Sequence, residues 1–130
     1  LGVQSDNLYV LSETCLGDVL ESVEGEKPDV LIVDSIQTLY QDSLESPAGS
    51  VAQVRACTLE LMQLAKGEGI TVFVTTHFMD EAEYCDRISI MVDGVIRALD
   101  TPGELKRQFN ATTMDDVFQQ LARQAVRTAD

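Results

Sequence analysis

The sequence predicts an α/β fold in three layers, in which helices cover a mostly parallel sheet. Two short apolar runs, Val30–Val33 and residues 70–74, each end in polar residues, as buried parallel strands do. Residues 51–66 lie between them and carry apolar side chains at helical spacing, so strand, helix and strand follow one another. Further along, the pair Asp93-Gly94 predicts a β-hairpin. We expect residues 1–130 to form a single α/β domain.

The first third of the chain predicts a strand, a helix and a second strand. Residues 8–11 (LYVL) are apolar and follow a turn-forming Ser-Asp-Asn, which favours a strand. Residues 16–23 have apolar side chains at helical spacing, and Gly25 is expected to end that helix. Val30–Val33 then reads as a strand buried on both faces. Asp34 follows it directly, at the carboxyl edge where open α/β sheets bind ligands.

The middle of the chain predicts a mobile loop, a long helix and a third strand. Residues 41–50 are polar and contain a proline and a glycine, which is typical of a loop. The helix over residues 51–66 is the clearest in the sequence, and glycines at 67 and 69 are expected to end it. The strand over residues 70–74 finishes in Thr75 and Thr76, which we interpret as strand-end residues.

The remaining residues predict a short acidic helix and the hairpin. The acidic helix covers residues 79–85, and its Glu81 and Glu83 are expected to face solvent. The hairpin strands cover residues 87–92 and 95–99.

Two helices are expected after the hairpin. Thr101 is a natural N-cap with Pro102 at the first helical position, and Asn110 is expected to end that helix. Thr113 caps a last helix in which Met114 begins an apolar face.

The composition excludes several classes of function. The formal net charge is −13, with twelve acidic and three basic residues up to Thr75 and ten against six after it. Since nucleic-acid binding needs clustered lysine and arginine, we expect no autonomous binding to DNA or RNA. No apolar run reaches membrane-spanning length, so no membrane insertion is expected. Nothing marks secretion, and the start without methionine indicates a piece of a longer chain.

The three cysteines indicate a reducing compartment. Cys15, Cys57 and Cys85 are odd in number, widely spaced and without a C-x-x-C pair. We therefore expect small buried thiols and a cytoplasmic location.

The first part of the chain, from residue 1 to about 74, resembles a known family. The residues that carry the resemblance are NLYVLSET, KPDVLIVDSIQTLYQDSLESPAGSVAQVR and LELMQLAKGEGITVFV. They resemble the RecA-like ATPase core of the bacterial RadA family of DNA-repair proteins. The resemblance implies that Asp34 is the Walker B aspartate, which holds the Mg²⁺ of a bound nucleotide, with Ser35 beside it. It also implies that loop 41–50 corresponds to a loop facing DNA.

The second part, from about residue 71 to 123, resembles a different family. TVFVTTHFMDEAEYCDRISIMVDGVIRALDTPGELK is similar to the C-terminal part of an ABC-transporter ATP-binding subunit. By this resemblance His77 is the switch histidine that contacts the γ-phosphate. The two resemblances overlap at TVFV, a strand that both families possess. The chain is therefore interpreted as a chimera of two P-loop NTPases, with residues 1–74 from one and residues 75–130 from the other.

A phosphate-binding loop is absent from these 130 residues. No G-x-x-x-x-G-K-[S/T] occurs, although both resembled families hold phosphates with that loop. Ser35 stands where an ABC subunit has its catalytic glutamate. We therefore expect a truncated P-loop NTPase domain that lacks the Walker A strand and has no autonomous activity. Mg-ATP would be its ancestral ligand, no cofactor is expected to bind tightly, and Mg²⁺ on Asp34 alone would be weak.

Two alternatives stay open at this point. One is a weak Mg-nucleotide-binding domain or ATPase, in which Asp34 holds Mg²⁺ and His77 senses phosphate. The other is an interaction module that assembles with a RadA-like or ABC-type partner.

The missing strand also predicts self-association. Without it, residues 70–74 and 88–92 must pair directly, or another chain must fill the gap between them. Because unsatisfied strand edges favour association, we expect a homodimer, with exchange of elements as one form of it.

Overall fold

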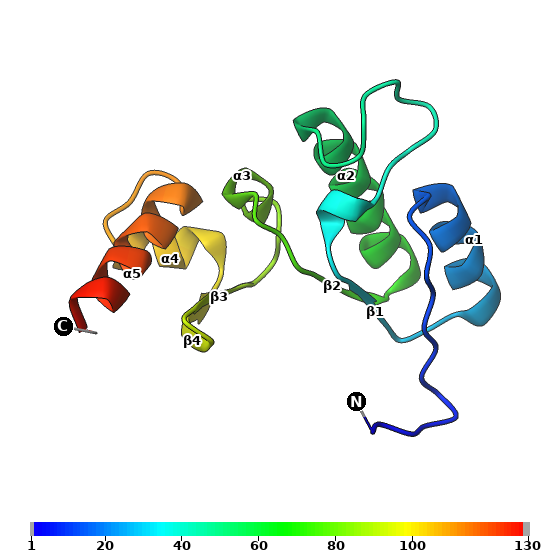
Figure 1. Cartoon of the computed structure of the whole chain (residues 1–130), viewed down its shortest axis with the longest axis horizontal. Coiled ribbons are helices and arrows are strands. Elements are labelled where there is room, and N and C mark those ends of the chain that lie inside the picture. Colours follow the sequence, from blue (N-terminus) through cyan, green and yellow to red (C-terminus); the bar gives the residue numbers. More distant parts are fainter. Residues whose placement is uncertain (1, 129–130) are drawn as a thin grey trace. The chain divides into compact units, whose positions relative to one another are not determined.

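The computed structural model describes residues 2–128, and the chain divides into two compact units. Unit 1 covers residues 1–75 and unit 2 covers residues 76–130. Across the described residues there are five α-helices and two small sheets, one parallel and one antiparallel, so the α/β prediction is confirmed (Figure 1). None of the helices in this part of the chain is long and apolar enough to cross a bilayer.

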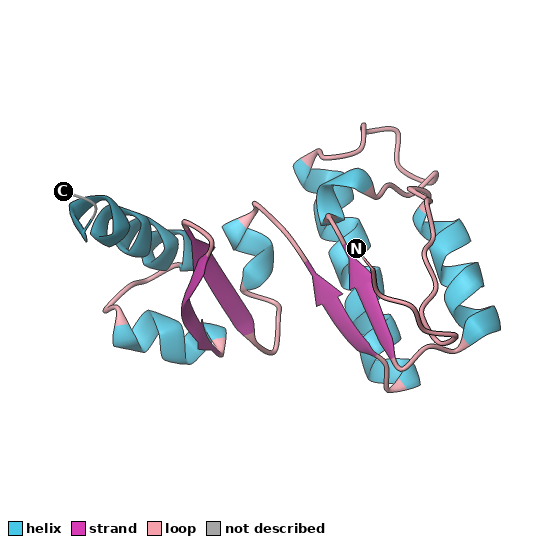
Figure 2. Cartoon of the chain, turned by 60° about the horizontal axis from the view of Figure 1, so that its bottom comes forward, coloured by secondary structure: helices cyan, strands magenta, loops and turns pink. Residues whose placement is uncertain are grey.

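Unit 1 is built on one strand–helix–strand unit that is preceded by a helix. Its elements are α1 (Leu16–Glu26), β1 (Val30–Val33), the 3₁₀ turn η1 (Ile36–Thr38), α2 (Val51–Glu68) and β2 (Thr71–Val74). β1 and β2 pair in parallel from Val30↔Thr71 to Val33↔Val74, which confirms the predicted parallel arrangement. Figure 2 shows the two strands side by side over α2.

The helices of unit 1 begin and end where local chemistry requires. Ser50 caps α2, since its side chain accepts a hydrogen bond from the backbone N–H of Gln53 at 3.3 Å. Gly69, with φ of 66°, ends α2 in the left-handed conformation that glycine tolerates best. α1 runs past Gly25, which was expected to end it, and stops at Lys27, whose N–H donates to Val23 O at 2.8 Å.

The core of unit 1 lies between the helices and one face of the sheet. It contains Cys15, Leu16, Val19, Val23, Val33, Ile36, Leu39, Val54, Cys57, Leu61 and Ile70. The other face of the sheet is open: Val30 is 52% exposed, Ile32 66% and Phe73 54%. The prediction that Val30–Val33 is buried on both faces was therefore wrong, because only one face of the two-stranded sheet is covered by helices.

The predicted strand over residues 8–11 is also wrong. These residues are irregular, and each of their four side chains is more than half exposed. Beyond them the chain joins the rest of unit 1 through an isolated parallel bridge between Cys15 and Tyr40. The N–H of Tyr40 donates to Thr14 O at 3.0 Å, and the N–H of Leu16 donates to Tyr40 O at 2.9 Å.

Unit 2 is a hairpin packed against three helices. Its elements are α3 (Met79–Ala82), β3 (Ile88–Val92), β4 (Val95–Asp100), α4 (Pro102–Gln108) and α5 (Met114–Thr128). The predicted hairpin is confirmed, with Asp93 and Gly94 at φ of 52° and 74° in its two-residue turn. β3 pairs with β4 and not with β2 in the described residues, so direct pairing of residues 70–74 with 88–92, the first of the two predicted alternatives, does not occur there.

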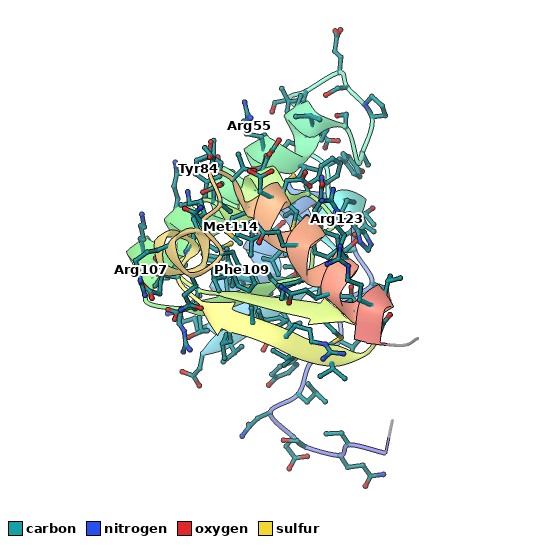
Figure 3. The ribbon with its side chains drawn as sticks, turned by 90° about the vertical axis from the view of Figure 1, so that its left-hand side faces the viewer. Arg55, Tyr84, Arg107, Phe109, Met114 and Arg123 are labelled. Carbon is teal, nitrogen blue, oxygen red and sulfur yellow. The ribbon has the colours of Figure 1, made fainter. Side chains whose placement is uncertain are left out.

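The core of unit 2 is supplied mainly by its helices. Its buried members are Ala82, Ile88, Ile90, Leu105, Met114, Val117 and Leu121. Figure 3 shows Met114 and Phe109 on the side of the hairpin that carries α4 and α5, with Arg107 pointing outward from α4. Thr101 caps α4 by accepting from the N–H of Glu104 at 3.2 Å, as predicted.

Two glutamates of unit 2 were wrongly predicted to face solvent. Glu81 is 4% exposed and Glu83 is partly buried, although both were expected on a solvated face. α3 is only four residues long and packs against α5, so its acidic side turns toward protein. Glu83 Oε2 pairs with Lys106 Nζ at 2.6 Å, and Glu83 Oε1 accepts from the N–H of Met114 at 3.0 Å.

Candidate functional site

The candidate site in unit 1 lies at the carboxyl edge of the parallel strand pair. β1 ends at Val33 and β2 at Val74, and these two residues are partners in the register. The next residue on each strand, Asp34 and Thr75, is therefore brought to the same edge. Thr75 Oγ1 donates to Asp34 Oδ1 at 2.6 Å, and Asp34 is exposed to solvent.

Backbone hydrogen bonds fix the turn that follows Asp34. Thr75 N–H donates to Val33 O at 3.0 Å and Ile36 N–H donates to Thr75 O at 3.1 Å, so the end of β2 is bonded on both sides of Asp34. Ser35, joined to Asp34 by a cis peptide bond, accepts at its carbonyl from Thr38 Oγ1 at 2.8 Å. Asp34 and Ser35 are thus held at a defined position on the sheet edge.

The donor set at this edge is small. Mg²⁺ in proteins is held by one or two carboxylates, with waters and substrate phosphates completing an octahedron. Asp34 fits one such carboxylate position, with the Thr75 hydroxyl as a neighbouring oxygen. Within residues 2–128, however, no three His, Cys, Asp or Glu side chains are grouped so that they could hold a metal ion. The residues present therefore fit a single-carboxylate magnesium ligand and nothing tighter.

His77, the other predicted site residue, belongs to unit 2. It is exposed and lies two residues before α3. The hydrogen bond between Thr75 and Asp34 lies within unit 1, and His77 takes no part in it.

Loop 41–50 is held by one buried side chain, which sequence reasoning missed. Gln53 on α2 is completely buried. Its Oε1 accepts from the N–H of Gln41 at 2.8 Å, and its Nε2 donates to Gln41 O at 3.1 Å, Leu44 O at 3.4 Å and Ser46 O at 2.9 Å. The loop is irregular, as predicted, but its backbone is anchored at three points.

An acidic groove of about 270 Å³ lies beside this loop. It is lined by Cys15, Leu16, Gly17, Leu20, Gln41, Asp42, Ser43 and Glu60. The thiol of Cys15 donates to Asp42 Oδ2 at 3.6 Å. Because its two ionisable carboxyl groups repel anions, this groove is not suited to a phosphate group.

The three cysteine thiols differ in how deeply they are buried. Cys15 and Cys57 are buried, as predicted, whereas Cys85 is exposed, and all three are free. Burial raises the pKa of the Cys57 thiol to about 11, with the nearby charge of Glu60 adding to the rise. Cys57 is therefore an inert core residue and not a candidate nucleophile.

Comparison with known proteins finds relatives that are DNA repair proteins named RadA. No family model matches the chain. The DNA repair protein RadA of Listeria monocytogenes is 48% identical over 81 residues, which cover 62% of this chain and 18% of that protein. RadA of Synechocystis is 52% identical over 75 residues, which cover 58% of this chain and 15% of that protein. RadA of Campylobacter jejuni is 32% identical over 139 aligned residues, which cover 100% of this chain and 31% of that protein.

The chain is thus homologous to RadA proteins over much of its length, and it spans less than a third of each of these relatives. The alignment with the Campylobacter protein covers the whole chain at 32% identity, and those with the Listeria and Synechocystis proteins cover 81 and 75 residues at 48% and 52% identity. None of these three relatives is a transporter subunit, so the resemblance of residues 71–123 to ABC subunits stays a prediction.

Proposed function

We propose that the chain is part of a RecA-like ATPase domain that keeps the magnesium-binding aspartate of its relatives, Asp34, and has no ATPase activity of its own. The observation that carries the proposal is the position of Asp34. It stands at the carboxyl edge of a parallel strand pair, held by Thr75, in a chain homologous to RadA proteins. This is where doubly wound α/β sheets bind ligands.

The lack of activity follows from what surrounds Asp34 in unit 1. P-loop NTPases bind the phosphates of a nucleotide with a glycine-rich loop and its lysine, and no such motif occurs in these 130 residues. Unit 1 contains only three basic residues, Lys27, Arg55 and Lys66. Lys27 precedes β1 and therefore lies at the opposite end of that strand from Asp34. Three cations and no glycine-rich loop are few groups with which to hold a triphosphate at Asp34.

A nucleotide titration tests the proposal. We expect no turnover above background and a dissociation constant for fluorescent Mg-ATP weaker than about 1 mM. Asp34→Ala and His77→Ala should leave both results unchanged. Turnover that Asp34→Ala abolishes would instead establish the weak-ATPase alternative, and a loss of binding in His77→Ala would support His77 as a phosphate sensor.

We further propose that residues 75–130 come from an ABC-type ATP-binding subunit. The chain would then be a chimera of two P-loop NTPases that lacks the Walker A strand. What supports this is the unit boundary at Thr75/Thr76, which coincides with the join between the two resemblances. Units of separate origin should unfold separately. Calorimetry is expected to show two transitions, and one cooperative transition seen by every probe would contradict the chimera.

The activity on DNA that the relatives' names imply is not expected in this chain alone. Unit 1 has twelve acidic residues against three basic ones, and loop 41–50 contains no lysine or arginine. A titration with single-stranded oligonucleotide at low salt should therefore show no saturable binding. The three free thiols support a reducing, cytoplasmic location.

A further inference from the structure

The acidic groove beside loop 41–50 combines an apolar lining with two carboxylates. The apolar part comes from the first two turns of α1, where Leu16 is buried and Leu20 is half-buried. Asp42 borders the groove from the loop and Glu60 borders it from α2. Among the described residues that line it there is no lysine or arginine. The groove therefore offers apolar surface and negative charge together.

The electrostatic potential beside the groove is negative. Tyr40 directly precedes loop 41–50, and the pKa of its phenol is raised first by the Cys15 thiol and then by the carboxylates of Asp42, Glu13 and Asp18. Three carboxylates therefore act on one point next to the groove. The N-terminal end of the α1 dipole adds only about half a positive charge there. The carboxylates outweigh it, so this part of unit 1 favours a cation.

Hydrogen bonds hold the walls of the groove in place. On the loop side, Gln53 bonds the backbone N–H and carbonyl of Gln41 at 2.8 and 3.1 Å. On the other side, the start of α1 is fixed by the N–H of Leu16, which donates to Tyr40 O at 2.9 Å. A groove that is already formed costs a ligand less ordering entropy when it binds.

The size of the groove suits a single side chain. Its volume of about 270 Å³ is smaller than the roughly 300–1,000 Å³ of clefts that enclose a small-molecule ligand. An arginine matches both parts of the lining, because its methylene stem packs on apolar surface while its guanidinium donates to carboxylates on more than one side. The Cys15 thiol donates to Asp42 Oδ2 at 3.6 Å, and a thiol is a weak donor, so Asp42 keeps acceptor positions for a guanidinium.

We propose that the acidic groove is a docking site for an arginine side chain on a basic peptide segment of another protein. Charge complementarity selects this occupant. The net charge of −13 attracts a basic peptide from a distance, and the two carboxylates above an apolar lining select arginine at close range. Because the attraction is ionic, raising NaCl from about 50 mM to about 500 mM should weaken the complex.

The test is fluorescence anisotropy of the full chain, in reductant, with a fluorescein-labelled glycine-serine peptide that carries two arginines. The dissociation constant should lie below about 1 mM at about 50 mM NaCl. Asp42→Asn combined with Glu60→Gln should raise it at least about tenfold, because both charges in the groove are lost. Glu24→Gln combined with Glu26→Gln is the matched control. It removes the same charge from exposed residues at the other end of α1 and should change the constant less than about twofold.

Gly17→Leu tests the groove without any change of charge. Gly17 lies in the first turn of α1 and lines the groove, and the nearest atom to a Cβ at this position would be Cys15 Sγ, at an ordinary contact distance of 3.9 Å. Leucine is also a better helix former than glycine. The variant should therefore remain folded, as circular dichroism can show, and should raise the dissociation constant at least about fivefold by filling the groove.

Several results would overturn the proposal. A dissociation constant above about 1 mM would do so. Equal weakening by the Glu24/Glu26 control would mean diffuse attraction to the net charge, and an unchanged constant in Gly17→Leu would mean that the groove is not used. Equally tight binding of a peptide with glutamine in place of arginine, or displacement by spermidine at equal concentration, would exclude recognition of arginine. Self-association that Asp42→Asn with Glu60→Gln abolishes in sedimentation equilibrium would assign the groove to a second copy of this chain.

Discussion

Replacing Gln53 gives the sharpest test of what stabilises loop 41–50 on unit 1. Replacement by alanine removes a completely buried amide that bonds the backbone of loop 41–50 at Gln41, Leu44 and Ser46. Each hydrogen bond contributes about 1 kcal/mol net to the free energy of unfolding. The three shorter bonds, two to Gln41 and one to Ser46, together predict a loss of about 3 kcal/mol. The cavity left behind adds to that cost. A domain the size of unit 1 has a free energy of unfolding of only about 4–11 kcal/mol, so this loss is a large fraction of its stability.

Urea unfolding followed by circular dichroism and tyrosine fluorescence measures this loss. Gln63→Ala is the matched control, because Gln63 lies on the same helix, is exposed, and should cost less than about 0.5 kcal/mol. Hydrogen exchange of the Gln41 amide, which donates to Gln53 Oε1, should also accelerate in Gln53→Ala. The reasoning fails if Gln53→Ala and Gln63→Ala unfold at the same urea concentration.

Three further predictions concern side chains in both units. Glu83→Ala should destabilise unit 2 by about 1–3 kcal/mol, because it removes the ion pair with Lys106 and the acceptor for Met114 N–H. Glu83→Gln should cost less, because glutamine still accepts from Met114 N–H. Thermal melts that rank the two variants in the reverse order would contradict this prediction. Hydrogen bonds from Arg107 and Gln108 lower the pKa of Glu104 to about 2, so its contribution to stability is present above its ordinary pKa of 4.5 and is lost as pH falls from there toward 2. Carboxyl NMR titration should find this low pKa, and Arg107→Ala should raise it toward 4.5. Burial raises the pKa of Cys57 to about 11 and also raises the pKa of Cys85, but only Cys85 is exposed. Iodoacetamide at pH 8 should therefore label Cys85 slowly in the native protein and Cys57 only after denaturation, as peptide mass spectrometry can show.

The sequence allowed the local elements to be predicted well, because their signals are local. The hairpin follows from Asp93-Gly94, α4 from Thr101-Pro102, and α2 from its apolar stripe between Ser50 and Gly69. The strand predicted over residues 8–11 failed for the opposite reason. A strand forms only if a neighbour accepts its backbone hydrogen bonds, and no pattern within four residues reports whether that neighbour is present.

The candidate site was predicted in part. The position of Asp34 at the end of β1 follows from the apolar run before it. Its hydrogen bond with Thr75 was not predicted, although the equal ends of two parallel strands bring these two residues together. Gln53 also left a signal, since it is a polar residue at helical spacing from the buried Cys57 and Leu61. Glu83 left none: its contacts with Lys106 and Met114 join residues more than 20 positions apart, and only the packing of α3 on α5 brings them together.

The core of unit 2 has a consequence for the order in which the protein acquires structure during synthesis. Leu105, Met114, Val117 and Leu121, which fill most of that core, are all made after the hairpin. While the ribosome is still adding them, the apolar side of β3 has nothing to pack on, and α3 lacks the helix that Glu83 joins it to. Unit 1, whose buried side chains run from Cys15 to Ile70, can condense first. A released fragment of residues 1–110, which lacks α5, should therefore resist protease in its first unit and be cut freely in its second.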